Sequence, residues 1–416
     1  MRGSALLAIV IAATTPLLIL TVVAVATGFR LVAWQPPVLW QHSLGVGGVT
    51  AIASDSSGVY VEGYNHWQLV GPGSVFLKKY DSSGGVVWNR TIGEFNNAMI
   101  NEMSVGTDSI YLSAGNFSNG IFLKYDLAGN NLWERDYAAG TNPIWGSSFG
   151  LSALPEGVYV TGDSSLWTSP TYASSVAWVR EYDSAGNAAW TSEFSSDTII
   201  STHVYASSLG VFIAYSAGNT TRYLGSFLAK YSLSGNQLWT RQVPAAGGIS
   251  GDSTGVYLTG SSIYKYDFNG NLDWVTPINS PDGLLVHDSS VSVNSYGIYV
   301  SASTISHLYL LKYDLGGSQI WNIELPSSEG NAHSVSANSS AVYVLGWVSS
   351  NVAIVERLSP DASLIFFGLN PPWSFMLLGG LIGASAICII TFQRLRRKTV
   401  RPLRVGPSQH TLPTTD

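Results

Sequence analysis

The chain has 416 residues, a net charge of −6, 11% charged and 12% aromatic residues, and 43 glycines. Its single cysteine, Cys388, excludes an intramolecular disulfide framework. Outside Arg2, the basic tail and Asp416, about 13 Lys and Arg face about 25 Asp and Glu, so the body carries roughly −12. A body this acidic makes nucleic acid an unexpected partner.

The first predicted element is an apolar run over residues 5–29, preceded by Arg2. The small residues Ala24-Val25-Ala26 form a plausible cleavage site. We therefore assign residues 1–29 to a signal peptide or a signal anchor; the length of the run favours neither.

A repeated motif, Tyr-Asp-x-x-Gly-x-x-x-Trp, then fills residues 38–368. A segment resembling Gly-Val-Tyr-Val precedes each copy, centred on Tyr60, Tyr111, Tyr159, Phe212, Tyr257, Tyr299 and Tyr343. The seven units recur every 42 to 53 residues or so, which is typical of propeller blades. The copies run from Tyr80 to Trp88, Tyr125 to Trp133, Tyr182 to Trp190, Tyr231 to Trp239, Tyr266 to Trp274 and Tyr313 to Trp321, with a weaker copy from Leu358 to Phe366.

Each unit contains four short runs rich in Val, Tyr, Trp and Thr, separated by Asp, Ser and Gly, as expected for strands and tight turns. Four-stranded sheets packed around an axis cover one another's faces. The sequence therefore predicts an all-β, seven-bladed β-propeller of four-stranded antiparallel blades.

The Asp-x-x-Gly-Asn segments, such as residues 126–130, are expected to form hairpin turns. The Asp side chain accepts hydrogen bonds from turn amides, and Gly adopts positive φ. Calcium binding is the alternative, but each turn offers a single carboxylate where a calcium loop supplies several. We predict no metal site.

The motif Asp81-x-x-Gly84-x-x-x-Trp88 resembles two related families, the bacterial and archaeal seven-bladed propeller repeats and the pyrroloquinoline-quinone (PQQ) type repeats. The resemblance covers about residues 38 to 368. It implies that the recurring Trp residues dock one blade on the next, and it leaves function open.

Alignment of the units on their tyrosines exposes the innermost strand. An apolar column lies eight places before each tyrosine, and small or polar residues occupy the neighbouring columns. Because successive strand residues point to opposite faces, we expect the apolar column between blades and the small polar columns along a central channel. Three residues of this channel could bind a ligand or take part in chemistry: Glu102, His203 and Tyr205. Asp288 is expected nearer the mouth of the channel. The plainer interpretation is that these side chains are polar groups hydrated by water in the channel.

The long connections are predicted to share one end of the ring, opposite the tight turns. They cover residues 64–73, 136–147, 163–175 and 276–285. Aromatic residues on loops are favoured binding anchors, although they can also simply cap the blades. Our candidate binding residues on this long-loop face are His66, Trp67, Trp145, Trp167 and Tyr172.

A strand around residues 38–43, with Trp40 at the docking position, precedes the first complete unit. We predict that it completes the last blade beside the strand from Val352 to Leu358. Both chain ends would then leave the ring at the tight-turn end. If residues 363–368 formed the outer strand instead, this closure would fail.

The last predicted elements are a transmembrane helix over residues 371–392 and a basic tail over residues 393–416. Six Lys and Arg follow the apolar run, which places the tail in the cytoplasm and the propeller outside the cell. Four glycosylation sequons permit an external location but arise easily by chance in this composition: Asn89, Asn116, Asn219 and Asn338.

These features predict a non-enzymatic, membrane-anchored binding or scaffold protein that recognises an extracellular protein or an envelope glycan. The alternative, from the PQQ resemblance, is a quinoprotein-like dehydrogenase. The sequence lacks the adjacent Cys pair that some of those enzymes use, and no Asp base with a calcium cluster is recognisable. No cofactor is therefore expected, and the sequence shows no hydrolase motif.

Overall fold

The computed structural model describes residues 38–358, apart from residues 47, 65–71, 97–98, 116–119, 137–144, 170–171, 196–197, 219–222, 285, 287, 306, 326–331 and 350–351. Every described strand belongs to the compact unit Gln35–Ala362. The predicted terminal segments, residues 1–29 and 371–416, lie outside the described part of the chain. Within that part no helix is long and apolar enough to cross a membrane.

The strands form seven four-stranded antiparallel sheets, one for each sequence repeat. The first three are blade 1, β2(Gly48–Asp55), β3(Gly58–Tyr64), β4(Pro72–Asp81) and β5(Val86–Asn96); blade 2, β6(Met99–Val105), β7(Ser109–Gly115), β8(Gly120–Asp126) and β9(Asn131–Asp136); and blade 3, β10(Trp145–Leu154), β11(Gly157–Ser169), β12(Tyr172–Asp183) and β13(Ala188–Ser195).

Blades 4 to 6 continue in chain order. They are β14(Thr198–Ser207), β15(Gly210–Gly218), β16(Tyr223–Tyr231) and β17(Gln237–Val243); β18(Gly248–Gly251), β19(Val256–Thr259), β20(Ser262–Tyr266) and β21(Leu272–Pro277); and β22(Asp288–Asn294), β23(Gly297–Ser303), β24(Leu308–Tyr313) and β25(Gln319–Leu325). Blade 7 contains β26(Ala332–Ala337), β27(Val342–Ser349), β28(Val352–Leu358) and β1(Val38–Val46).

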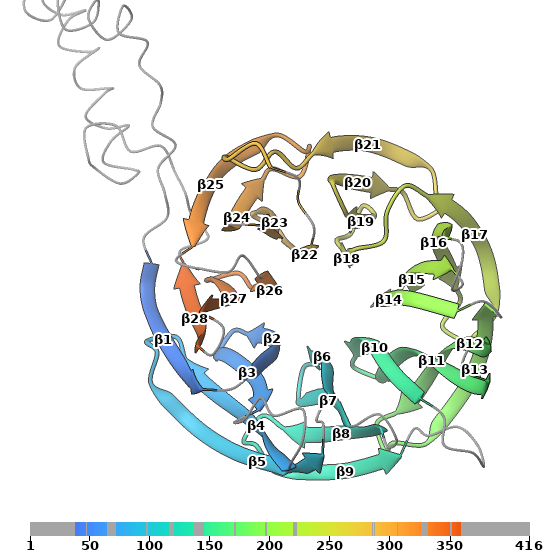
Figure 1. The fold of residues 1–416 in the computed structure, drawn as a ribbon, viewed down its shortest axis with the longest axis horizontal. Helices are drawn as coiled ribbons and strands as arrows, with labels where there is room; N and C mark the ends of the chain where they lie inside the picture. The colour runs from blue at the N-terminus through green and yellow to red at the C-terminus, as the bar shows by residue number, and fades with distance from the viewer. Residues whose placement is uncertain are drawn as a thin grey trace, which may run out of the picture. The chain divides into compact units, whose positions relative to one another are not determined.

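The sheets are arranged as a ring, with the first strand of each blade innermost and the fourth outermost (Figure 1). Each first strand contacts the first strands of both neighbours, and contact between β26 and β2 closes the circle. The predicted all-β propeller of four-stranded antiparallel blades is confirmed.

The closing strand is the one predicted from Trp40. β1 pairs antiparallel with β28, and Val38 lies opposite Leu358. Leu358 in turn lies opposite Val342, beside the short turn between β26 and β27. Both ends of the ring therefore leave at the tight-turn end, as predicted.

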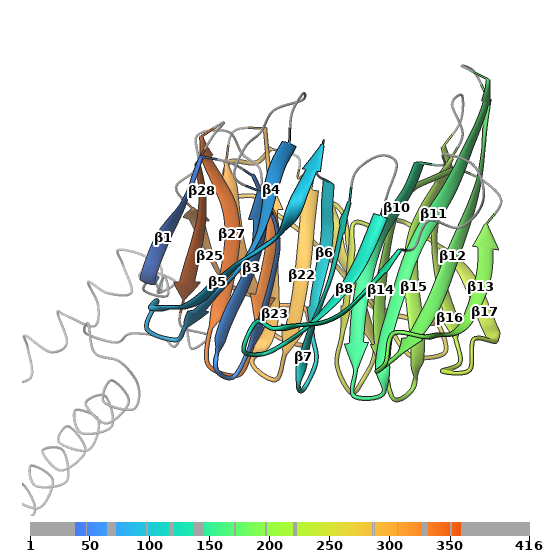
Figure 2. The same cartoon turned by 90° about the horizontal axis from the view of Figure 1, so that it is seen from below.

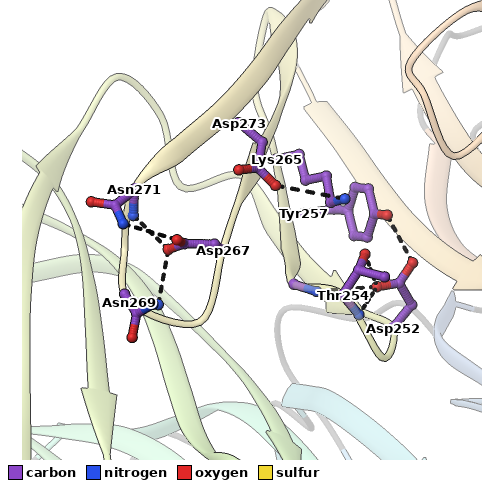
Figure 3. A network of polar contacts seen from close by, with 9 residues as sticks. Asp252, Thr254, Tyr257, Lys265, Asp267, Asn269, Asn271 and Asp273 are labelled. Carbon is purple, nitrogen blue, oxygen red and sulfur yellow. Dashed lines mark hydrogen bonds and ion pairs between the residues drawn. The ribbon is translucent and has the colours of Figure 1, made fainter.

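The Asp-x-x-Gly turns have the predicted chemistry. In the turn of blade 2, Asp126 Oδ1 accepts the amide hydrogens of Ala128 and Asn130, and Gly129 has φ +82°. Figure 3 shows the equivalent turn of blade 5, where Asp267 accepts hydrogen bonds from Asn269 and Asn271. These carboxylates are occupied by their own turns; in blade 4 Ser232 takes the same place, and its Oγ accepts the amide hydrogen of Asn236.

The recurring Trp residues dock each blade on the turn of the next. The indole Nε1 of Trp88 donates to Leu127 O at 3.2 Å, and that of Trp133 donates to Ser184 O at 3.1 Å. A Cβ on Gly129 would lie 3.0 Å from the Trp88 ring. The turn glycine is therefore required twice, for its positive φ and for the close approach of the indole.

The two ends of the ring differ in the lengths of their connections. In the side view of Figure 2, short turns follow one edge, and the tips of β11 and β12 project at the other. The prediction of a long loop over residues 163–175 is wrong, because most of it is this extended hairpin: β11 and β12 stay paired out to Ser169 and Tyr172. The backbone pairing continues although the tip lacks hydrophobic alternation: Ser164 lies opposite Val176, Leu166 opposite Ser174 and Trp167 opposite Ala173.

Candidate functional site

The innermost strands carry the apolar column as predicted. Its members that face neighbouring blades are nearly all buried, with Ile249 half-buried: Ile52, Met103, Leu151, Val204, Ile249, Val291 and Val335. Ile52 packs with residues of blade 7, including Tyr343. This column holds the blades together around the axis.

The serines one place after the apolar column connect the blades directly. Ser104 Oγ accepts the amide hydrogen of Ala153 in the next blade at 3.0 Å, and Ser152 Oγ accepts that of Ala206 at 2.9 Å. Ser250 and Ser292 repeat the contact with Val293 and Ala337. We call this set the serine ladder. Its hydroxyls join blades, so they are not the free channel lining that the sequence pattern suggested.

Tyr205 occupies the ladder position of blade 4. A Cβ on Gly251 of blade 5 would lie 2.4 Å from the Tyr205 ring, so the ring covers that glycine. Tyr205 also lies beside Phe212, with ring centroids 6.4 Å apart. The structure thus separates Tyr205 from the other candidates and gives it a packing contact between blades.

Glu102 and His203 do come together. Glu102 Oε1 lies 3.9 Å from His203 Nδ1, although the two residues are on β6 and β14, two blades apart. The same column position in the intervening blade is Gly150, where a Cβ would lie 3.1 Å from His203 Cα and 2.8 Å from Thr161 Oγ1. The missing side chain leaves the two polar groups free to approach.

Glu62 is a third member of this group, which sequence reasoning missed. It lies on β3, opposite Ala51, and is fully buried. Neither carboxyl oxygen has a hydrogen-bond partner among the residues that the structure describes. The signal was available: two residues after the repeat tyrosine, the other blades have Ser113, Thr161, Ala214, Thr259, Ser301 and Leu345. Glu62 is the only ionisable residue in that column.

Burial sets the protonation of this inner cluster, which we define as Glu62, Glu102 and His203. It raises the pKa of Glu62 well above the ordinary value, with a smaller contribution from the nearby Glu102. It also raises the pKa of Glu102 to about 8 and lowers that of His203 to about 4. Of the three, only Glu62 is fully buried, whereas 36% of the Glu102 side chain and 27% of the His203 side chain remain accessible.

At neutral pH the inner cluster therefore presents carboxylic acids and a neutral imidazole. Such groups donate and accept hydrogen bonds without a net charge. Within the described ranges, no group of three or more His, Cys, Asp or Glu side chains is placed to hold a metal ion. The geometry fits water or a neutral polar ligand.

The long-loop face gathers the other candidates on the third blade. Trp145 begins β10 opposite Ser165 of β11, Trp167 lies opposite Ala173, and Tyr172 begins β12 opposite Ser169. All three therefore stand on or beside the projecting hairpin (Figure 2). Asp288 begins β22 opposite Ser303 at the same end of the ring. His66 and Trp67 lie outside the described residues.

A second polar cluster on this face was also missed. His307 Nδ1 lies 3.0 Å from Asp282 Oδ2, and Thr304 Oγ1 donates to the same oxygen at 3.0 Å. Glu324 Oε1 lies 3.8 Å from His307 Nε2. Partial burial opposes ionisation of Asp282, but its pKa is lowered overall by hydrogen bonds from the Leu284 amide and from Ser280, Thr304 and His307. His307 could not be found from the sequence, because its partner is 25 residues away.

These observations define a β-propeller body with a polar inner cluster and an aromatic hairpin on one face. No family model and no curated protein matches the chain. Among solved structures, Sqt1 of Saccharomyces cerevisiae matches with a TM-score of 0.47 and 12% identity over 78% of this chain and 100% of that chain.

The Dos1 propeller matches with a TM-score of 0.48 and 10% identity, covering 77% of this chain and 95% of that chain. A protein of unknown function from Bacteroides caccae matches with a TM-score of 0.40 and 11% identity, covering 68% and 94%. At these identities the likenesses concern the fold, and they carry no statement about function.

Proposed function

We propose that this protein is a membrane-anchored, extracytoplasmic binding or scaffold module that recognises a protein or a cell-envelope glycan through its long-loop face. The observation that carries the proposal is that the chain ends and the projecting hairpin lie at opposite ends of the ring. The first and last described residues, Val38 and Leu358, pair at the tight-turn end. The projecting hairpin with Trp167 and Tyr172 stands at the other end.

The anchoring rests on the sequence at both ends of the body. An apolar run lies on each side of the propeller, and the C-terminal run precedes Arg394, Arg396 and Arg397. Basic residues next to a membrane span favour the cytoplasmic side. Anchors attached at the tight-turn end would turn the hairpin away from the membrane, where a partner reaches it.

The hairpin suits recognition because a rigid scaffold positions it. Strands β11 and β12 have 13 and 12 residues, more than any other strand of the body. Trp and Tyr contribute large contact areas with little loss of conformational entropy, and they dominate binding energies at interfaces. Because the hairpin continues two paired strands of the blade, it is a better-positioned anchor than a free loop.

Topology is tested by protease treatment of intact cells that carry the full-length chain with a C-terminal tag. The propeller should be digested and the tagged tail spared. Protection of the propeller until the cells are opened would reject the proposed orientation.

Binding is tested with the full-length chain in nanodiscs against a glycan array and a defined library of extracellular proteins. We expect Trp167→Ala with Tyr172→Ala to abolish binding to the selected partner. The matched control is Tyr296→Ala, which removes an exposed tyrosine, 45% accessible, from a tight turn of blade 6. Loss of binding in the control alone would reject the hairpin as the binding element.

The quinoprotein alternative remains a prediction from the repeat resemblance and has a separate test. Addition of PQQ and calcium should leave the absorption spectrum as a simple sum of the components. Saturable quinone binding with dye reduction by alcohols would favour the dehydrogenase.

A further inference from the structure

The outer edge of the propeller carries a recurring exposed aliphatic side chain. It is the first or second residue of the fourth strand in six of the seven blades, and it is 40–56% accessible in each. Blade 3 has Ala188 and Ala189 at this place. We call these residues the apolar rim: Leu39, Val87, Leu132, Leu238, Leu272 and Ile320.

Strand alternation explains why five of the six rim residues face solvent. All but Leu272 directly precede the docking Trp, whose side chain turns towards the next blade, so the residue before it points the other way. None of the six belongs to a hydrophobic cluster of the described body. Single exposed apolar residues are ordinary, but recurrence along one edge needs a reason.

The rim lies at the tight-turn end. Fourth strands begin directly after the Asp-x-x-Gly turn, and β1 begins opposite the last residue of β28. Two further exposed apolar residues, Leu209 and Tyr296, occupy tight turns at the same end. One end of the ring thus combines both chain ends with a circle of aliphatic side chains.

The distance to the predicted membrane segments is short. Residues 30–37 separate the first apolar run from β1, and residues 359–370 separate β28 from the second. Eight extended residues reach at most about 28 Å. The tight-turn end is therefore held near the bilayer if the anchors of the proposed function are correct.

We propose that the apolar rim rests in the headgroup region of the bilayer, so that the propeller stands on the membrane with its hairpin outward. This inference rests on the membrane anchoring of the proposed function. Shallow insertion of aliphatic side chains at the boundary of headgroups and acyl chains removes apolar surface from water.

Charge selects the kind of lipid. The turns beside the rim carry Asp81, Asp126, Asp183, Asp267 and Asp314. Arg90 and Arg135 donate to the carbonyls of the same turns, so this end presents charges of both signs. A zwitterionic surface, of the phosphatidylcholine type, matches such a mixture.

The test uses the full-length chain in phosphatidylcholine nanodiscs with Cys388→Ser, which removes the native thiol. A fluorophore is attached to single cysteines introduced as Leu132→Cys or Leu238→Cys on the rim. The matched control is Tyr223→Cys, an equally exposed position, 58% accessible, at the long-loop end of β16. We expect brominated lipids to quench the two rim probes at least three-fold more strongly than the control.

Equal quenching at all three positions, with the protein still bound to the nanodisc, would overturn the rim contact and leave the anchor intact. Stronger quenching at position 223 would mean that the propeller is inverted. Failure of the protein to co-elute with nanodiscs would reject the anchor itself, and the rim contact with it.

Discussion

Two residues after the repeat tyrosine, six blades place a small hydroxyl residue or an apolar one, and the first blade places Glu62. Thr259 shows how the position can be satisfied, since its hydroxyl donates to Ser289 O of the next blade at 3.2 Å. The Glu62 carboxyl has no such partner, and burial keeps it protonated. A buried polar group without a partner costs stability, and an ionised one costs more.

We expect Glu62→Gln to stabilise the protein increasingly as pH rises. Below about pH 4 the carboxyl is protonated in both folded and unfolded states, so the substitution changes little. Above that pH the unfolded chain ionises first, and the stability contributed by the protonated form is progressively lost, by at most about 1.4 kcal/mol per pH unit. Gln cannot ionise and removes this loss.

The measurement is the melting temperature from pH 4 to 8, with the exposed Glu193→Gln as control. A constant difference across this range would show that Glu62 ionises normally.

His203 acts in the opposite direction: its pKa of about 4 means that stability present above pH 6.5 is lost as pH falls towards 4.

Trp321 departs from the other docking residues. Its ring is 2% accessible, yet its Nε1 has no hydrogen-bond partner among the described residues. The next blade is blade 7, whose outer strand β1 comes from the other end of the chain, so within the described part no turn leads from β28 into the outer strand. The residue two places after the docking Trp shows the same difference. In blades 1 and 2 it is Arg90 and Arg135, which donate to turn carbonyls of the next blade, whereas after Trp321 it is Ile323, which cannot donate.

We therefore expect Trp88→Phe to cost about 1 kcal/mol more than Trp321→Phe, because only Trp88 loses a hydrogen bond. Urea unfolding of the two variants decides this. Equal losses would mean that the Trp321 indole has a partner of equal strength.

At the scale of the element, the tight turn before the fourth strand of a blade combines two requirements in one glycine. Gly235 has φ +83°, and a Cβ on it would lie 2.5 Å from Trp190 Cδ2. Gly283 has φ +72° with no atom within 4 Å of a Cβ. A substitution at Gly283 therefore tests backbone strain alone, whereas one at Gly235 tests backbone strain together with steric contact.

Gly283→Ala should cost about 1 to 2 kcal/mol, the penalty of a left-handed backbone. Gly235→Ala should cost about 1 to 3 kcal/mol more, because the Trp190 ring must move. Chemical unfolding of both variants checks the difference, and similar losses would show that the indole yields freely.

Strands and turns were predictable because their signals are local. The period, the Asp and Gly of each turn and the docking Trp all lie within one repeat. The sequence predicts a loop at the tip of β11 because Asp163 to Ser169 lack the hydrophobic alternation that marks a strand. It predicts a channel residue at Tyr205 because it does not reveal the contact of this ring with Gly251 of the next blade. Glu102 and His203 met only because Gly150 leaves a gap between them, which depends on ring geometry.

At the scale of the whole molecule, the ring depends on one strand from the other end of the chain. Trp40 Nε1 donates to Ser82 O of blade 1, and its ring packs near Tyr80 and Tyr343. β1 thus fills the outer position of blade 7 and docks on blade 1 at the same time.

Trp40→Ala should destabilise the whole body by about 3 kcal/mol, at the lower end for buried aromatic truncations because Trp40 is only partly buried. Leu39→Ala, at a position 46% accessible, is the control and should change stability by less than about 0.5 kcal/mol. In calorimetry, the Trp40→Ala variant should show a single cooperative unfolding transition at a lower melting temperature. A small separate transition would mean that β1 melts independently of the ring.

The pairing of Val38 with Leu358 also determines how the propeller responds to force. When tension is applied between the two chain ends, β1 and β28 part from that pair onward, and their hydrogen bonds break one after another instead of together. This is unzipping, which resists load far less than shear. The seam that completes the circle is therefore its mechanical weak point, and the other six blades bear no load until it has opened.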